Sequence, residues 1–417
     1  MPIFQSRLKD TLVKSASGIC IETENKRYLD AISGMFNMPF GYSCKPIVKT
    51  ICKTLSRLPF HPKEHFYTED YVNVSECLLK KTSMDNGGVL FLSGGSEAVE
   101  AAITMAIQYH LKTTNATKRK IIARAHSYHG ATLGARSVTG RNNFADILTN
   151  GYDTVRIAPP FPVHGGNGKE QPYGADDIEN AIVREGPDNI AAFIFEPVNH
   201  LKGMHQASLE YLQGVRMLCS KYNILMITDE IVSGMGRTGP FLNTHKFGVT
   251  PDIAILGKGL SGGYTPVSAI VANSQITNTF TGNDDWRYFS YSHTYAANPV
   301  GISATKAALL LLQSIEHTDE FRVLQRSFES KVAELRSLGN VIRSESSGLV
   351  AGITLDSENG KCVEEHCFKS GVIVRGEENW IALVPSYTTS ASELNEIFGV
   401  LRKAIQTVSL KRRRTDV

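Results

Sequence analysis

The chain has 417 residues, of which 42% are hydrophobic and 20% are charged, proportions that are ordinary for a globular enzyme. Its length suits one large domain together with a smaller one. The 44 Lys and Arg residues nearly balance the 41 Asp and Glu residues, which leaves a net charge of +3 and argues against a nucleic-acid-binding protein.

The seven cysteines are scattered and include no Cys-x-x-Cys pair, which favours reduced thiols and a cytoplasmic location. Residues 1–9 lack an apolar segment, so no secretory signal is predicted. The sequence also lacks a run of about 18 apolar residues, so we expect no membrane span. The basic run at residues 411–414 is interpreted as a solvated tail, with a nuclear signal as the less favoured alternative.

The first elements are a hairpin and a helix. Residues 18–32 alternate apolar and polar around a polar turn, which predicts the hairpin, and residues 47–58 have helical spacing. His61 and His65 could suggest a metal site, but Pro62 argues against a helix that presents both imidazoles. We therefore expect no metal here.

The central region alternates predicted strands and helices. Strand patterns occur at residues 89–92, 121–124, 191–195, 222–229 and 253–256. This alternation predicts a mostly parallel sheet flanked by helices, with ligands at the carboxyl ends of the strands. Ser93, Glu196, Asp229 and Lys258 each follow such a strand. His126 and His129 could form a ligand pair for a metal, but no third ligand stands nearby.

Lys258 lies between two glycines directly after an apolar strand. Lysines are rarely buried without a role, and desolvation lowers their pKa toward the range where the neutral amine attacks carbonyl groups. Lys258 could therefore hold an aldehyde cofactor as a Schiff base; the alternative is a surface lysine in a Gly-rich turn. Asp229 could pair with the pyridine nitrogen of such a cofactor.

A phosphate site is predicted upstream, where a strand runs through a Gly-rich turn into a helix. The backbone N–H groups of Gly94, Gly95 and Ser96 stand at the predicted helix start, where they could bind the cofactor phosphate. Residues 157–176 are rich in Pro and Gly and predict a surface loop. Further elements are predicted downstream, as helices at 302–312, 321–338 and 391–407, a strand at 350–355, and a strand pair at 372–375 and 380–384.

Together these parts resemble the class III aminotransferases, which are pyridoxal-phosphate enzymes of fold type I. The match follows family order from residue 15 to residue 405, nearly the whole chain. The motifs that carry the resemblance are Ser93-Gly-Gly-Ser-Glu-Ala98, Tyr128-His-Gly130, Glu196-Pro197, Asp229-Glu230, Gly234-Met-Gly-Arg-Thr-Gly239, Gly257-Lys-Gly-Leu-Ser-Gly-Gly263, His293-Thr-Tyr295 and Asn298-Pro299.

The resemblance implies an α/β fold with three parts. Residues 49–304 would form a large domain that binds the cofactor on a mostly parallel seven-stranded sheet. Residues 305–417 would form a smaller α+β domain, and residues 1–48 would supply a hairpin to the small domain and a wall to the active site.

The resemblance also implies the site. Lys258 and Asp229 would be catalytic. The residues that would contact pyridoxal 5′-phosphate are Gly94, Gly95, Ser96, Tyr128, His129, Glu196, Asp229, Ile231, Lys258 and Thr294. Tyr128 would stack on the ring opposite Ile231, His129 would be structural, and Glu196 would join a hydrogen-bond network near the cofactor. Thr294 would reach the phosphate of a neighbouring subunit, which implies a homodimer with shared active sites.

The substrate half departs from the family pattern. Ala382 stands where amino-acid-type members carry an arginine for the α-carboxylate, and Asn199-His200 replaces the usual Gln-Gly. A methyl group cannot replace a bidentate guanidinium. Arg375 is the remaining candidate for a substrate carboxylate, with a structural ion pair as the alternative. Phe36 and Tyr128 would complete the substrate pocket.

The predicted function is pyridoxal-phosphate-dependent transamination by a ping-pong mechanism. The amino group would move from an amine or ω-amino compound to a keto acid or aldehyde. The alternatives are another reaction on the same cofactor (decarboxylase, aminomutase or phospho-lyase), an aminotransferase for a specialised biosynthetic carbonyl compound, and a cofactor-free scaffold protein. Intact Asp229 and Lys258 argue against the scaffold.

Overall fold

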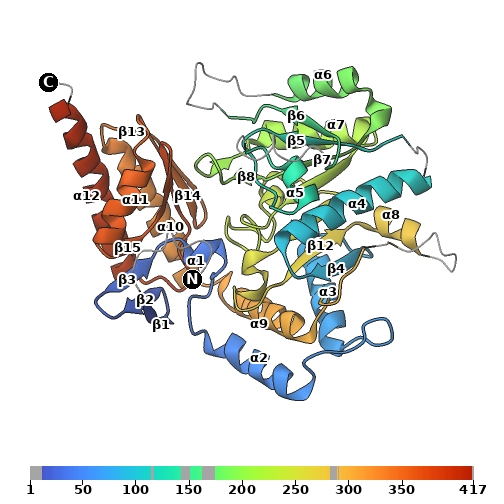
Figure 1. The fold of residues 1–417 in the computed structure, drawn as a ribbon, viewed down its shortest axis with the longest axis horizontal. Coiled ribbons are helices and arrows are strands. Elements are labelled where there is room, and N and C mark those ends of the chain that lie inside the picture. Colours follow the sequence, from blue (N-terminus) through green and yellow to red (C-terminus); the bar gives the residue numbers. More distant parts are fainter. Residues whose placement is uncertain are drawn as a thin grey trace. The chain divides into compact units, whose positions relative to one another are not determined.

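The structure is a computed structural model that describes residues 12–113, 117–141, 151–161, 174–281, 289 and 291–415. The chain divides into two compact units (Figure 1). The large unit is Lys49–Glu316, and the small unit joins Met1–Val48 to His317–Val417. Much of the loop predicted at residues 157–176 lies outside the described residues.

A seven-stranded sheet forms the centre of the large unit. Its strands, in spatial order, are β4 (Gly88–Leu92), β12 (Ser268–Ala272), β11 (Ile253–Leu256), β10 (Leu225–Asp229), β7 (Ile190–Phe195), β5 (Lys120–Arg124) and β6 (Thr154–Ile157). Strand β12 runs antiparallel to both of its neighbours, and the other pairs are parallel. The predicted mostly parallel seven-stranded sheet is confirmed.

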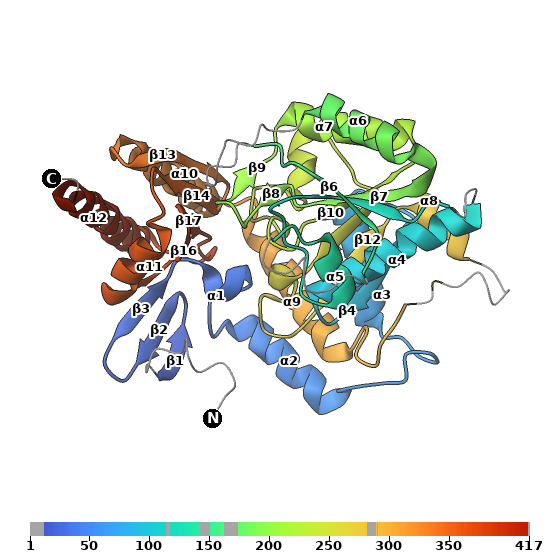
Figure 2. The ribbon, with the colours of Figure 1, turned by 45° about the horizontal axis from the view of Figure 1, so that its top comes forward.

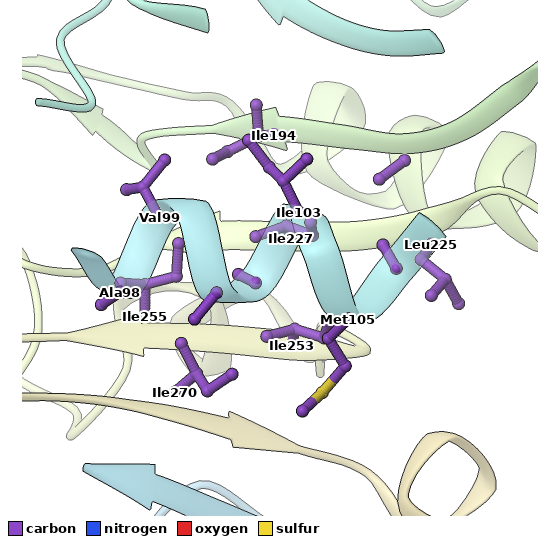
Figure 3. Close-up of a cluster of buried hydrophobic side chains, with 14 of the residues drawn as sticks. Ala98, Val99, Ile103, Met105, Ile194, Leu225, Ile227, Ile253, Ile255 and Ile270 are labelled. Atoms are coloured by element: carbon purple, nitrogen blue, oxygen red, sulfur yellow. The ribbon is translucent and has the colours of Figure 1, made fainter. Parts of the chain in front are cut away.

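The strands are continuous apolar runs because helices cover both faces of the sheet. All six residues of β7 are buried. Ile194 points to one face, where α4 (Gly95–Thr113) packs with Ala98, Val99 and Ile103 against the strands (Figure 3). Phe193 and Phe195 point to the other face and pack with residues of two further helices. Those helices, α6 (Ala175–Glu185) and α7 (Leu209–Lys221), lie side by side in Figures 1 and 2.

Shorter elements complete the large unit. Helix α9 (Pro299–Ile315) begins three residues before the predicted start, with Asn298 as the N-cap that accepts the N–H of Gly301 at 2.7 Å and with proline at the first helical position. The remaining α-helices and a two-stranded hairpin are α3 (Glu69–Lys81), α5 (Leu133–Val138), α8 (Ser274–Thr277), β8 (Val198–Asn199) and β9 (His205–Gln206). Helix α2 (Lys45–Arg57) runs from the small unit into the large one.

The described part of the small unit contains two four-stranded sheets and four α-helices. The sheets are β1 (Val13–Ser17), β2 (Cys20–Thr23), β3 (Arg27–Asp30) with β15 (Val372–Ile373), and β13 (Val341–Ser347), β14 (Val350–Leu355), β17 (Trp380–Leu383) with β16 (Arg375–Glu377). The helices are α1 (Ser33–Phe36), α10 (Asp319–Glu334), α11 (Gly360–Lys369) and α12 (Ala391–Thr415). Strands β2 and β3 form the predicted N-terminal hairpin.

One predicted strand pair is only partly right. Strand β16 pairs with β17, but Val372 and Ile373 pair in parallel with β3 instead. Glu378 has a φ of +43° and turns the chain so that Glu377 lies opposite Trp380. Before Arg375, the N–H groups of Leu29 and Ala31 bond to the backbone oxygens of Gly371 at 2.8 Å and Ile373 at 3.0 Å, and these bonds hold Val372 and Ile373 on β3.

No helix in the described part of the chain has both the length and the apolar character needed to cross a bilayer.

Helix α4 supplies a test of the core. Ile103 is fully buried between α4 and the sheet, whereas Leu111 on the same helix is 47% exposed. Ile103→Ala should lower the free energy of unfolding of the large unit by about 2–5 kcal/mol, because it removes buried methyl groups and leaves a cavity. Leu111→Ala should change it by less than about 0.5 kcal/mol. Guanidinium unfolding followed by circular dichroism measures both, and equal losses would contradict the packing described for α4.

Candidate active site

The strands of the large unit place chemical groups at one edge of the sheet. Glu196 follows β7, Asp229 ends β10, and Lys258 follows β11 after one glycine. These three strands are parallel neighbours, so their carboxyl ends meet at the same edge. Lys258 itself has a φ of +46°, a left-handed conformation that costs a residue with a side chain about 1–2 kcal/mol. Strained backbone of this kind is concentrated at functional sites.

A cavity of about 200 Å³ opens where these groups meet. It is lined by Gly95, Ser96, Tyr128, His129, Gly130, Glu196, His200, Asp229, Ile231, Val232 and Lys258. The structure therefore brings together most of the predicted cofactor contacts. Thr294 is exposed on a turn and does not line the cavity, and Phe36 and Arg375 belong to the small unit.

Asp229 is a buried carboxylate with two partners. Its Oδ2 lies 2.8 Å from Nδ1 of His129, which donates, and its Oδ1 accepts the N–H of Ile231 at 3.2 Å. Each oxygen of an ionised carboxylate can accept a further hydrogen bond, so Asp229 can still receive a donor from the cavity. The sequence did not reveal the contact with His129, because the two residues are far apart in the chain and no spacing connects them.

His129 has more than the structural role that the resemblance implied. Its imidazole is buried and lines the cavity, and its Nε2 has no hydrogen-bond partner among the described residues. Buried polar atoms are nearly always satisfied in folded proteins. The unpartnered nitrogen in this wall indicates that a polar ligand completes the site.

Lys258 carries an amine that is tuned by its surroundings. Burial lowers the pKa of the Lys258 ammonium below its usual value, and the negative charges of Asp229 and Glu196 oppose that shift without cancelling it. A lowered pKa increases the fraction of neutral amine near neutral pH. The neutral amine is the form that attacks a carbonyl carbon and accepts a proton from carbon.

Glu196 is the second buried carboxylate of the site. Its Oε1 accepts the N–H of Tyr128 at 2.9 Å, and its Oε2 lies 2.5 Å from Nδ1 of His200. Burial raises the pKa of Glu196, but the charge and hydrogen bond of His200, the charge of His129 and the N–H of Tyr128 together bring it down to about 2. Glu196 is therefore ionised, and His200 is a member of the site that the sequence marked only as a departure from the family pattern.

The first turn of helix α4 lies beside the cavity and packs closely against Ile231. A Cβ on Gly95 would come within 2.9 Å of Cδ1 of Ile231, so a side chain at this position would displace the end of Ile231. The N–H groups of Gly95 and Ser96 lie in the first turn of the helix, where an anion is stabilised. The N–H of Gly94 is already bonded to the carboxylate of Glu97 at 2.8 Å, so the predicted phosphate contact at that residue has a competitor.

These residues fit an aldehyde cofactor that carries a pyridine ring and a phosphate. The amine of Lys258 suits the aldehyde, the carboxylate of Asp229 suits a protonated ring nitrogen, and the first turn of α4 suits the phosphate.

Comparisons with known proteins agree with this chemistry. The family model described as "Aminotransferase class-III" matches residues 5–405. An omega-aminotransferase of Caulobacter vibrioides is 30% identical over 95% of this chain and 94% of that protein. An omega-amino acid–pyruvate aminotransferase of Pseudomonas putida is 26% identical over 94% of this chain and 91% of that protein.

A solved structure shares the fold. The PMP-bound form of an aminotransferase from Vibrio fluvialis superposes with a TM-score of 0.88 at 24% identity and covers 97% of this chain and 94% of that one. The resemblance seen in the sequence motifs is thus confirmed over nearly the whole chain. The chain belongs to the class-III aminotransferase family, whose enzymes move amino groups with pyridoxal 5′-phosphate.

Proposed function

We propose that this aminotransferase takes its amino group from an amine or an ω-amino compound and gives it to a keto acid. The proposal rests on the residue at position 382, which is alanine. This residue occupies the place of the α-carboxylate arginine, and in the structure it is fully buried within β17, opposite Gly352 of β14. A buried methyl group offers nothing to an α-carboxylate, so donors without one are favoured.

Named relatives support this substrate class. The Pseudomonas putida relative is called an omega-amino acid–pyruvate aminotransferase, and a Pseudomonas aeruginosa relative at 26% identity is called a putrescine–pyruvate aminotransferase. Both names describe an amine on a terminal carbon as donor and pyruvate as acceptor.

Lys258 and Asp229 have different roles in the proposed reaction. The bound cofactor supplies the aldehyde that takes up the amino group and the ring that absorbs the electron pair left when a carbon–hydrogen bond breaks. Asp229, held in place by His129, keeps the proton on the ring nitrogen. Lys258 would hold the aldehyde of the cofactor, and its amine would carry the proton that leaves one carbon and returns to another.

Four further residues would hold the ring and the phosphate. Tyr128 and Ile231 both line the cavity, and we place the ring between them. The phosphate would lie against the N–H groups of Gly95 and Ser96. Gly130 supports this arrangement, because its φ of +142° and its contact with Ser96 leave no room for a side chain.

Arg375 is the group that we assign to the acceptor carboxylate. It is directly opposite Ala382 in the β16–β17 pair. Opposed residues of an antiparallel pair project from the same face of the sheet, so the neighbouring strand places a guanidinium on the face where Ala382 offers only a methyl group. Arg375 is bonded to the carboxylate of Glu377, which a keto acid would have to replace or share.

A homodimer with shared active sites follows from the role proposed for Thr294. Thr294 is exposed, and the neighbouring Tyr295 is 63% exposed with its ring against Phe60. Lys63 ties the segment after Phe60 to this turn by bonding to the backbone oxygen of His293 at 2.5 Å. Exposed aromatic groups of this kind are typical of protein interfaces, and a second copy of the chain would cover them.

Lys258→Ala tests the assignment of the amine. The variant should fold and lose at least about a thousandfold in turnover, because it lacks both the carbonyl ligand and the proton carrier. Purified wild-type protein should show the absorbance of a bound aldehyde, lose it with an amine donor alone and regain it with a keto acid. Lys258→Ala should show neither change, whereas Lys246→Ala, at an exposed lysine, should behave as wild type. Turnover of Lys258→Ala within tenfold of wild type would refute the assignment.

Thr294→Ala tests the shared phosphate site. Loss of one hydrogen bond to a charged group should weaken cofactor binding about tenfold and leave turnover at saturating cofactor nearly unchanged. Cofactor content after dialysis measures the first effect, and light scattering gives the oligomeric state. Thr281→Ala, at another exposed threonine of the large unit, is the control. A fully active monomer would contradict both the contact and the homodimer.

Arg375→Ala tests the acceptor site. Removing a charge-assisted bidentate contact should raise the KM for the keto acid about 30-fold or more, with little effect on the KM for a neutral amine. Glu377→Gln should lower the KM for the keto acid, since it removes the competing carboxylate. Equal effects of Arg375→Ala on donor and acceptor would leave Arg375 as a structural ion pair with Glu377.

A further inference from the structure

His200 lies in the wall of the cavity and contacts both Glu196 and Tyr128. Its Nδ1 donates to Oε2 of Glu196 at 2.5 Å, while Oε1 of Glu196 accepts the N–H of Tyr128 at 2.9 Å. The ring of His200 also meets the ring of Tyr128 edge to face, with 5.5 Å between centroids and an angle of 85° between planes. Glu196, His200 and Tyr128 therefore form a closed triangle.

The segment that carries His200 is fixed to the loop that carries Tyr128. Nδ2 of Asn199 donates to the backbone oxygen of His126 at 2.7 Å. The Oδ1 of Asn199 accepts the N–H of Lys202 at 3.2 Å, which holds the amide in this orientation. Asn199 is fully buried, and the imidazole of His200 is 13% exposed. Both residues are thus held against the loop at residues 126–130.

Within this triangle, Glu196 has the largest desolvation cost, because it is a buried carboxylate. A buried carboxylate is costly unless hydrogen bonds satisfy it, and removing one partner leaves the whole desolvation cost uncompensated. Glu196 has one side-chain donor, His200, and one backbone donor, Tyr128, in addition to a long contact of 3.4 Å from the N–H of His200. Only the first can be removed by substitution.

We propose that His200 is a positioning residue, which holds the Glu196 carboxylate and the Tyr128 ring in the places that the bound cofactor requires. The inference rests on the proposed function, since it takes Tyr128 to lie against the cofactor ring. The glycine that is usual at this place in the family has neither a side-chain donor nor a ring, so it could not hold Glu196 and Tyr128 in this way.

Three substitutions separate the two contacts of His200. His200→Gln keeps a donor for Glu196 without the aromatic edge, His200→Phe keeps the edge without the donor, and His200→Gly keeps neither. The matched control is His205→Gln in β9, on the same hairpin segment, because His205 stacks on Phe161 with 4.1 Å between centroids and does not line the cavity.

The measurements are the dissociation constant of pyridoxal 5′-phosphate for the apoenzyme, by fluorescence titration, and the visible circular dichroism of the bound cofactor at saturation. His200→Phe should weaken binding about tenfold and reduce the dichroism, because an unsatisfied buried carboxylate releases the Tyr128 ring. His200→Gln should stay within about threefold of wild type, and His200→Gly should be at least as weak as His200→Phe. His205→Gln should match wild type.

A double-mutant cycle with Glu196→Gln completes the test. If His200 acts through Glu196, the effects of His200→Phe and Glu196→Gln on the dissociation constant should be strongly non-additive. Additive effects, or equal binding and dichroism for His200→Phe and His200→Gln, would overturn the inference. Either result would leave the proposed function intact, because that function is tested on wild-type protein, which should lose the aldehyde absorbance with an amine donor alone and regain it with a keto acid.

Discussion

The active site depends on two buried carboxylates at the carboxyl end of a sheet that is covered on both faces. Such a sheet leaves little room for polar side chains in the interior of its central strands, so the reactive side chains lie where the strands end. Asp229 and Glu196 stand there in a low-dielectric setting, where an ionised carboxylate is stable only with hydrogen-bond donors or positive charge. His129 supplies a donor to the first and His200 to the second. The amine of Lys258 is in turn tuned by the same burial and the same two charges.

The adjacent residues Asp229 and Glu230 have different roles, although both are buried carboxyl groups. Asp229 lines the cavity, but Glu230 is buried outside it and accepts hydrogen bonds from Ser233 at 2.5 Å and from the N–H groups of Asn243 and Thr244 at 3.0 and 3.1 Å. Burial raises the pKa of Glu230 to about 7, although these donors oppose the shift. Glu230 therefore secures the loop after β10, which carries Ile231, while Asp229 lines the cavity.

The sequence was sufficient for the sheet and for the residues that follow its strands, because both depend on local patterns. Apolar runs marked β4, β7, β10 and β11, and Asp229 and Lys258 stood at their ends. Contacts between segments were not predictable in this way. The bond from His129 to Asp229 joins residues that no spacing relates. The bond from His200 to Glu196 spans four residues, but this segment forms strand β8 rather than a helix, so no helical pattern marks it. The pairing of Val372 with β3 joins strands near opposite ends of the chain, which the apolar pattern of either strand does not specify.

The proposed substrate choice follows from the register of one strand pair. In β16 and β17 the guanidinium belongs to Arg375, and its directly opposed neighbour is Ala382. Moving the charge by one strand displaces it by about 5 Å, the spacing between neighbouring strands, without changing the face from which it projects. We therefore expect the carboxylate of the keto acid to meet Arg375, while Ala382 offers no charge to the α-carboxylate of a donor. Glu377 beside Arg375 gives the guanidinium a partner when no carboxylate is bound.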